Sequence, residues 1–230
     1  YNWAQANVPV ITTLTSIFFV DASIGWAVGH DAVVLKTEDA GKTWAKQFDG
    51  FEANEMVLEQ AKQIKSKLED ELRTVNVMGN SARISAAEEA LENAEFALED
   101  AFIDFEDKST KPLLDVWFKN KQEGFVIGAY GMIFKTTDGG NNWSDWSNHV
   151  ENPDRFHLNA ITSVGEQVLL VAGEAGVIFR SEDKGETWTA IESPYSGSFF
   201  GLSETGEKNV VLAFGLRGNL FRSNDAGSYL

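Results

Sequence analysis

The chain has 230 residues, of which 43% are hydrophobic and 23% charged, the composition of a folded globular protein. Its 19 basic and 35 acidic residues give a formal net charge of −16, which argues against nucleic acids and anionic membranes as partners. The absence of cysteine excludes disulfides, thiolate catalysis and Cys-ligated metals, and no run of 18 apolar residues is present to cross a membrane.

The first segment, residues 16–48, predicts an antiparallel sheet. Apolar strands are expected at 16–20, 26–29 and 33–36, and a more polar strand at 45–48. Before the last strand lies the motif Thr37-Glu38-Asp39-Ala40-Gly41-Lys42-Thr43-Trp44. Asp39 can accept hydrogen bonds from backbone amides, Gly41 permits a positive φ and Trp44 buries a large ring, so the motif predicts a tight turn with a structural role.

Residues 52–109 differ in composition, with 15 acidic residues, 6 basic residues and one glycine. Apolar residues at three- and four-residue steps predict two amphipathic helices joined by a turn at Gly79-Asn80-Ser81. A capping box of Ser85 and Glu88 marks the expected start of the second helix. The apolar faces of the two helices are expected to pack against each other. They consist of Val57, Ala61, Ile64, Leu68, Leu72 and Val75 on the first helix, and Ala87, Leu91, Ala94, Leu98, Phe102 and Phe105 on the second.

Phe96 and Ile103 fall on the opposite side of the second helix, beside a row of glutamates. The hairpin itself does not use these two side chains. Either they rest against the rest of the chain, or they form a face for a protein partner.

The pattern of the first sheet returns three times after the helical segment. The repeated motifs contain Asp138, Gly140 and Trp143, then Asp183, Gly185 and Trp188, then Asp225 and Gly227. Their Asp residues are 45 and 42 positions apart, and the 99 positions between Asp39 and Asp138 hold one repeat plus an insertion. Four short strands per repeat of about 43 residues is the period of a propeller blade. The sequence therefore predicts an all-β Asp-box β-propeller built from residues 1–51 and 110–230, with an inserted α-helical hairpin at 52–109.

These motifs resemble Asp-boxes, also called bacterial neuraminidase repeats. The blade pattern, including the segments at 134–143 and 156–161, resembles the photosystem II stability/assembly factor family. The resemblance covers residues 10–51 and 110–230. The resemblance implies a non-enzymatic scaffold without a cofactor, which aids assembly or stability of a membrane protein complex through protein contacts. It also implies a periplasmic or lumenal location, with any signal peptide outside the 230 residues. Family members are seven-bladed with an arginine-rich patch, whereas the propeller part here has four repeats and only Arg155, Arg180, Arg217 and Arg222.

Four repeats admit two interpretations, a piece of a larger propeller or a compact four-bladed variant. The end of the chain inside the fourth motif favours the first. The segment Asn2-Trp3-Ala4-Gln5 reads like the tail of an Asp-box, so Trp3 is expected to open an outer strand that closes a ring with the last blade. An open set of blades would leave sheet faces uncovered, which predicts self-association.

Candidate binding residues come from the loops, because loops on a rigid scaffold carry binding. In a four-stranded blade, the turn between the second and third strands shares a face with the link to the next blade. We expect that face to hold the link that carries the hairpin, and the Asp-boxes to lie on the opposite face. The candidate partner-binding residues are His30, Tyr130, Arg155 and Arg217, together with Phe96 and Ile103.

A glycan-binding or sialidase-like glycoside hydrolase propeller is the alternative function, because Asp-boxes also occur in sialidases. That chemistry needs arginines that converge on a carboxylate, and a Tyr nucleophile with acidic partners. Convergence of Arg155, Arg217 and Tyr130 in one cleft would favour it. The basic residues before each motif are expected to pair with acids. A metal site would require His30, His149, His157 and Asp154 to converge, and no metal is expected.

Overall fold

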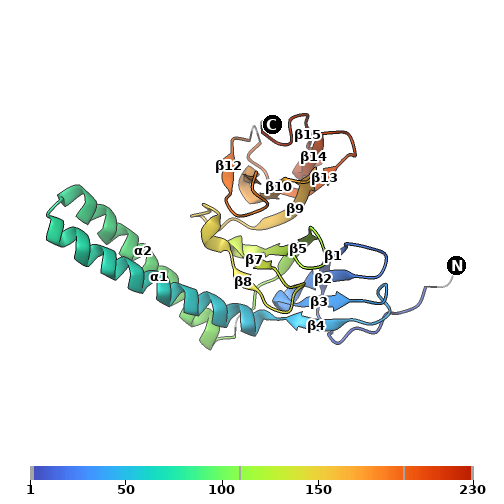
Figure 1. Cartoon of the computed structure of the whole chain (residues 1–230), viewed down its shortest axis with the longest axis horizontal. Helices are drawn as coiled ribbons and strands as arrows, with labels where there is room; N and C mark the ends of the chain where they lie inside the picture. Colours follow the sequence, from blue (N-terminus) through green and yellow to red (C-terminus); the bar gives the residue numbers. More distant parts are fainter. Residues whose placement is uncertain (1–2, 109, 194, 229–230) are drawn as a thin grey trace. The chain divides into compact units, whose positions relative to one another are not determined.

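The computed structural model describes residues 3–108, 110–193 and 195–228. The chain divides into two compact units, one formed by the residues before Gly50 and after Thr110, the other by Gly50–Thr110. Within the described residues, the first unit contains four antiparallel sheets and the second contains two helices (Figure 1). The predicted fold class, a β-propeller with an inserted helical hairpin, is confirmed.

Each sheet is one blade whose strands pair in sequence order. Blade 1 contains β1 (Leu14–Phe19), β2 (Gly25–Gly29), β3 (Val34–Thr37) and β4 (Ala45–Phe48). Blade 2 contains β5 (Leu113–Phe118), β6 (Gly124–Gly128), β7 (Ile133–Thr136) and β8 (Ser144–Asp145). Blade 3 contains β9 (Leu158–Val164), β10 (Val168–Gly173), β11 (Ile178–Ser181) and β12 (Thr189–Ile191). Blade 4 contains β13 (Phe199–Glu204), β14 (Val211–Gly215) and β15 (Leu220–Ser223).

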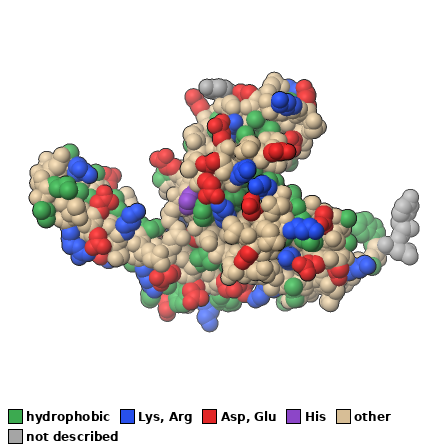
Figure 2. Space-filling view, in the orientation of Figure 1, with side chains coloured by type: hydrophobic (Ala, Val, Ile, Leu, Met, Phe, Trp, Pro, Cys, Tyr) green, Lys and Arg blue, Asp and Glu red, His purple; other side chains and the backbone are tan. Residues whose placement is uncertain are grey.

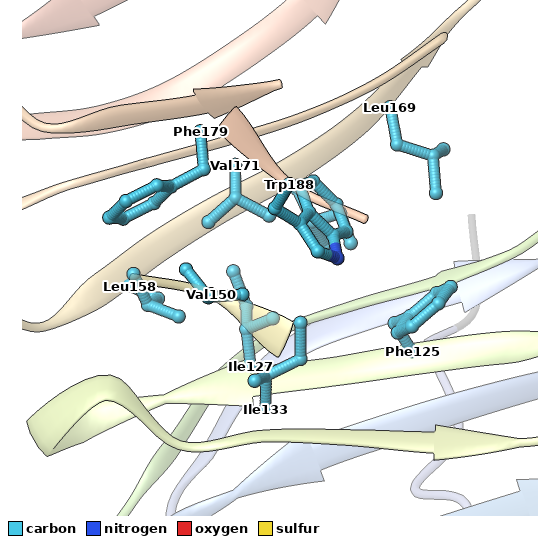
Figure 3. Close-up of a cluster of buried hydrophobic side chains, with 10 residues drawn as sticks. Phe125, Ile127, Ile133, Val150, Leu158, Leu169, Val171, Phe179 and Trp188 are labelled. Carbon is cyan, nitrogen blue, oxygen red and sulfur yellow. The ribbon is translucent and has the colours of Figure 1, made fainter. Parts of the chain in front are cut away.

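Apolar packing between consecutive blades forms the core of this unit. Figure 3 shows the cluster between blades 2 and 3, where Ile127 and Ile133 of blade 2 meet Leu158, Val171 and Phe179 of blade 3. All five side chains are at most 2% exposed. Because burial of one such side chain contributes roughly 1.5–3 kcal/mol, the cluster holds the two sheets face to face.

The Asp-box of blade 3 is a closed network of hydrogen bonds. The Ser181 hydroxyl donates to Asp183 Oδ1 (2.8 Å) and accepts from the Gly185 amide (2.7 Å). Asp183 also accepts from the Thr187 amide and hydroxyl at 2.9 and 2.6 Å. The indole of Trp188 donates to the Gly185 carbonyl (3.1 Å). Gly185 has a φ of +89°, and an added Cβ would lie 2.4 Å from the Phe125 ring, so the position requires glycine.

The other three motifs use the same hydroxyl and carboxylate. Hydroxyls of Thr37, Thr136 and Ser223 accept from the amides of Gly41, Gly140 and Gly227 at 2.8–3.0 Å. The carboxylates of Asp39, Asp138 and Asp225 accept from amides three or four residues on, at 2.9–3.2 Å. The indoles differ, since Trp44 donates to Gly41 (3.1 Å) whereas the Trp143 nitrogen is buried without a hydrogen-bond partner among the described residues.

The N-terminal segment does not close a ring with blade 4, contrary to the expectation for Trp3. Asn7 forms a parallel bridge with Thr43, and its backbone is hydrogen-bonded to Lys42 and Trp44 of blade 1. Trp3 is fully exposed. The reason is that Val8 and Val10 cover the apolar side chains of Ala27 and Leu35, which directs the segment onto the first blade.

The helical hairpin consists of α1 (Gly50–Met78) and α2 (Ser81–Glu106). The predicted capping box at Ser85 is wrong. Asn80 is the N-cap and its side chain accepts from the Arg83 amide, so α2 starts one turn earlier. Phe102 and Phe105 were also placed wrongly in the helix–helix seam, since they are 52% and 39% exposed.

Small residues build the seam of α2. Ala87, Ala94 and Ala101 are buried there, at heptad spacing, with Leu98 partly buried beside them. On α1 the buried partners are Leu58, Ala61 and Val75. Alanine lets two helix backbones approach closely, which leaves no room in the seam for the bulkier Phe102.

The Asp-box carboxylates make stability depend on pH. Hydrogen bonds from Thr43 lower the pKa of Asp39 to about 2. Desolvation would raise the pKa of Asp183, but hydrogen bonds from Thr187 and Ser181 outweigh it and lower that pKa to about 2. A carboxyl with a depressed folded-state pKa stabilises the fold above its ordinary pKa of 3.8 and loses this contribution as pH falls through the folded value.

We therefore expect the melting temperature to fall as the pH drops from about 4 to about 2. The double variant Asp39→Asn, Asp183→Asn should show a shallower decline, because its amides do not titrate. Thermal unfolding followed by circular dichroism across this range measures both slopes. Equal slopes for the two proteins would contradict the role given to these carboxylates.

Asp138→Ala should lower the free energy of unfolding by roughly 1–3 kcal/mol, because the Asn142 amide and the Thr136 hydroxyl lose their acceptor. Urea unfolding measures the change. Thr137→Ala, an exposed position in the same motif, is the control and should stay within about 0.5 kcal/mol of the parent.

Candidate functional site

The turn between the second and third strands has the same backbone in all four blades. It is a single 3₁₀ turn: η1 (His30–Ala32), η2 (Ala129–Gly131), η4 (Glu174–Gly176) and η5 (Leu216–Gly218). The middle residue is left-handed and never glycine, with φ of 60° at Asp31, 55° at Tyr130, 52° at Ala175 and 59° at Arg217. Non-glycine residues rarely adopt this conformation. Each blade thus presents one side chain at an equivalent, constrained position.

The tip of blade 2 lies against the link that leads to blade 3. A Cβ added to Gly131 would lie 2.8 Å from the Asn152 side-chain nitrogen and 3.7 Å from the Arg155 Cα. Asn152 holds the link through hydrogen bonds with the Phe156 carbonyl and amide at 3.0 and 3.1 Å. Tip and link therefore share one face of this blade.

A cluster of four side chains, the Tyr130 cluster, joins the tips of blades 2 and 3. It consists of Lys111, Tyr130, His157 and Glu174. The Lys111 Nζ lies 5.3 Å from the centre of the Tyr130 ring, and the His157 ring lies 4.9 Å from it. His157 Nδ1 is 2.8 Å from a Glu174 carboxylate oxygen, and the hydrogen bond from His157 lowers the pKa of Glu174. The Tyr130 ring is still 51% exposed.

The other loop candidates occupy separate blades. Arg155 is exposed in the link after blade 2 and adopts a φ of 53°. Burial raises the pKa of Asp145, and the charge of Arg155 acts against that rise. His30 lies on η1 of blade 1 and Arg217 on η5 of blade 4, and both are exposed. The structure therefore places the turn that carries Tyr130 beside the link that carries Arg155, and leaves His30 and Arg217 on other blades.

On the hairpin, Phe96 and Ile103 are 60% and 48% exposed, on the side of α2 away from its alanine seam. Lys65 of α1 pairs with Glu95 across the hairpin at 3.2 Å, next to Phe96. Acidic and basic side chains are interspersed over the visible face of the molecule (Figure 2). Phe96 and Ile103 are thus exposed apolar side chains with a charged pair beside them.

Two hollows formed by the described residues lack the features of a sialidase site. One hollow, of about 630 Å³, is lined by inner-strand residues such as Phe18, Trp117 and Thr162. A smaller one of about 340 Å³ is lined by residues around Tyr195. Neither is lined by Tyr130, Arg155 or Arg217, and the Tyr195 hydroxyl donates to the Leu216 carbonyl (3.0 Å).

The basic residues before the motifs pair with acids, as expected. Lys135 bridges to Glu186 of the next blade (2.6 Å), and Arg222 lies 3.0 Å from Glu207 in its own blade. Lys36 pairs with Glu38 at 3.1 Å and Arg180 with Glu182. In the described part of the chain, no group of three His, Asp or Glu residues is arranged to hold a metal ion.

Sequence reasoning singled out Tyr130 and placed the turn with Glu174 on the same face, but included neither Lys111 nor Glu174 among the candidate binding residues. A signal was available, because Glu174 opens the tip of blade 3 and His157 directly precedes the inner strand of that blade. Applying the blade topology to neighbouring repeats would have placed both near the tip of blade 2.

A family model described as photosynthesis system II assembly factor YCF48 matches residues 1–69 and 97–229. The chain belongs to this family. The photosystem II assembly lipoprotein Ycf48 of Synechococcus sp. (strain CC9902) is 31% identical over 116 residues, which are 50% of this chain and 34% of the relative. The chain thus spans about a third of the length of that curated relative.

Solved YCF48 structures share the fold. One, described as YCF48 bound to D1 peptide, has a TM-score of 0.61 at 21% identity and matches 100% of this chain and 55% of its own. YCF48 from Cyanidioschyzon merolae has a TM-score of 0.58 at 21% identity, covering 99% of this chain and 58% of its own. Within the described residues, no helix is long and apolar enough to cross a membrane.

The exposure of Phe96 and Ile103 yields a stability test. The double variant Phe96→Asp, Ile103→Asp should stay within about 0.5 kcal/mol of the parent, because both side chains lie in water. Ala94→Asp, on the buried side of the same helix, should cost about 2 kcal/mol or more, because it buries a charge in the seam. Urea unfolding followed at a helical signal compares the three proteins. A large loss in the double variant would show that these side chains are packed.

Proposed function

We propose that the chain is a non-enzymatic scaffold that binds an extended protein segment of a membrane complex on its loop face, defined here as the tips η1, η2, η4 and η5 and the links between blades. The scaffold acts in the assembly of photosystem II, the process that the description of its family names. The Tyr130 cluster is the observation that carries the proposal.

The chemistry of the cluster suits a peptide. The half-exposed Tyr130 ring offers a face for an apolar or aromatic side chain, and its hydroxyl can hydrogen-bond a backbone group. Lys111 beside the ring, and Arg155 on the adjacent link, supply local positive charge in a chain whose net charge is −16. Aromatic and Arg side chains on rigid elements are the groups that dominate protein–protein binding energy.

The same surroundings support a role without catalysis. Tyr130 is flanked by a lysine and an imidazole, and the acid nearest to that imidazole, Glu174, is already hydrogen-bonded to it. A Tyr nucleophile of a glycosidase would need carboxyl partners and converging arginines at the ring. The lipoprotein description of the Synechococcus relative supports an extracytoplasmic location, in a periplasm or thylakoid lumen, for this chain as well.

A D1 peptide is the probe, because a solved relative is described as bound to one. Fluorescence anisotropy with a labelled D1 peptide should give saturable binding to the parent chain. Tyr130→Ala should weaken it by about tenfold or more, since a central aromatic side chain is removed. Phe102→Ala, a similarly exposed aromatic residue on α2, is the matched control and should bind like the parent. No binding by the parent, or equal binding by Tyr130→Ala, would overturn the proposal.

A further inference from the structure

The smaller hollow lies on the loop face, between the tip η4 of blade 3 and the link around Tyr195. We call it the η4 hollow. It has a volume of about 340 Å³ and is lined by Ala175, Val177, Ile191, Ser193, Tyr195 and Ser196. Pockets that take small molecules span roughly 300–1,000 Å³, so the size of the η4 hollow suits a single side chain rather than a large cofactor.

The η4 hollow begins where the Tyr130 cluster ends. Glu174 holds His157 beside the Tyr130 ring, and the next residue, Ala175, already lines the hollow. The contacts that lead there are short, with 4.9 Å between the centres of the Tyr130 and His157 rings and 2.8 Å from His157 Nδ1 to Glu174. An extended segment rises about 3.3 Å per residue, so roughly three of its residues would span from the ring to the hollow.

The walls of the η4 hollow are held in place by other blade elements. A Cβ added to Gly176 would lie 1.8 Å from the Tyr195 carbonyl oxygen, so the tip and the link are in direct contact. The Tyr195 hydroxyl donates to the Leu216 carbonyl of η5 (3.0 Å), and its ring lies 5.2 Å from the ring of Phe199 in β13. A site that is already formed loses little conformational freedom when it is filled.

The lining of the η4 hollow is aliphatic. Val177 and Ile191 are partly exposed there. The Ser193 hydroxyl is already hydrogen-bonded to the backbone of Tyr195, with both its carbonyl and its amide at 3.2 Å. None of the described residues that line the hollow is charged. These surroundings suit a Val, Leu or Ile side chain and offer little to a sugar or a charged group.

In blade 2 the chain itself covers the equivalent position. Trp146 follows the motif Trp143 by three residues, as Ile191 follows Trp188. The link after blade 2 places the His149 ring flat on Trp146, with the ring centres 3.7 Å apart. The link after blade 3 is shorter and leaves Ile191 partly exposed, so a side chain of another molecule has access to it.

We propose that the η4 hollow is a second anchor point for the segment that binds over Tyr130, and that it takes an aliphatic side chain. The identity of that segment rests on the proposed function, whereas the preference for an aliphatic side chain follows from the hollow itself. The bound segment thus carries two anchors about three residues apart, one against the Tyr130 ring and one in the η4 hollow.

The variant Ala175→Tyr closes the mouth of the hollow with a residue that the turn accepts. Ala175 has a φ of 52°, and Tyr130 occupies the same turn position of blade 2 with a φ of 55°. Ala40→Tyr is the matched control, because Ala40 is also an exposed alanine with a left-handed backbone (φ 61°) but belongs to the Asp-box of blade 1. Circular dichroism checks that both variants are folded.

Binding of N-acetyl-L-leucinamide tests the hollow without any peptide. In methyl NMR spectra of the whole chain, the resonances of Val177 and Ile191 should shift saturably, with the roughly millimolar affinity of a small fragment. N-acetyl-L-serinamide should leave them unmoved. The shifts should disappear in Ala175→Tyr and persist in Ala40→Tyr. Equal shifts with the two amides, or unchanged shifts in Ala175→Tyr, would overturn the proposal.

Fluorescence anisotropy with the labelled D1 peptide tests the connection to Tyr130. Ala175→Tyr should weaken binding by about tenfold, and Ala40→Tyr should bind like the parent. An alanine scan of the peptide should find one apolar position whose loss weakens binding to the parent but not to Ala175→Tyr. A different position should behave in this way with Tyr130→Ala, because two groups in contact are not additive.

The outcomes separate this inference from the proposed function. If Tyr130→Ala weakens peptide binding and Ala175→Tyr does not, the function stands and the second anchor is wrong. If only Ala175→Tyr weakens it, the hollow stands and the role given to Tyr130 is wrong. If the parent does not bind the D1 peptide, the proposed function is wrong, and the titration with N-acetyl-L-leucinamide alone decides on the hollow.

Discussion

A blade of this repeat has two apolar faces and can bury neither of them alone. Every other feature of the propeller unit depends on that constraint. Ile127 and Ile133 are fully buried only because the sheet of blade 3 stands 45 residues further along the chain and packs on them (Figure 3). The hydrophobic effect is not directional, so the chain needs additional polar bonds to set how one blade meets the next.

Polar side chains on the inner strands supply that direction. One oxygen of Asp115 in β5 accepts from the Ser16 hydroxyl of blade 1 (2.6 Å), and the other accepts from the Ile161 amide of blade 3 (2.9 Å). Burial raises the pKa of this carboxyl, while the hydrogen bonds oppose the rise. Asn159 similarly donates to the Phe199 carbonyl of blade 4 at 2.8 Å. One carboxylate thus links three blades at positions where the apolar contacts alone would allow the sheets to slide.

The fold was predictable because it is repeated. Four copies of one motif identify the blades, and the hydroxyl, Asp and Gly of each motif form turns whose bonds are local in sequence, with a Trp added in the first three. The hairpin was predictable as an element, but the seam was not. Alanine carries a weak hydrophobic signal, so Phe102 was preferred to Ala101, although close helix packing favours the smaller side chain. The start of α2 was misjudged because Ser85 also fits a capping pattern.

The surroundings of Tyr130 were missed for a different reason. Lys111 precedes blade 2, whereas His157 and Glu174 belong to blade 3, so the docking of blade 3 on blade 2 is needed to bring all three to one ring. The path of the N-terminal segment was missed for a related reason. Its likeness to an outer strand is real in sequence, but Val8 and Val10 bind the nearest uncovered apolar surface, which belongs to blade 1.

The left-handed tips have a consequence for how this scaffold can change. A non-glycine residue in the left-handed conformation costs roughly 1–2 kcal/mol more than glycine does there. Glycine at position 130 or 217 would therefore stabilise the propeller but would remove the exposed side chain from the turn. At these positions a gain in stability would come at the loss of an exposed side chain, and the turn backbone accepts Asp, Tyr, Ala or Arg in the same conformation. The rim can vary its chemistry independently of the fold, one side chain per blade.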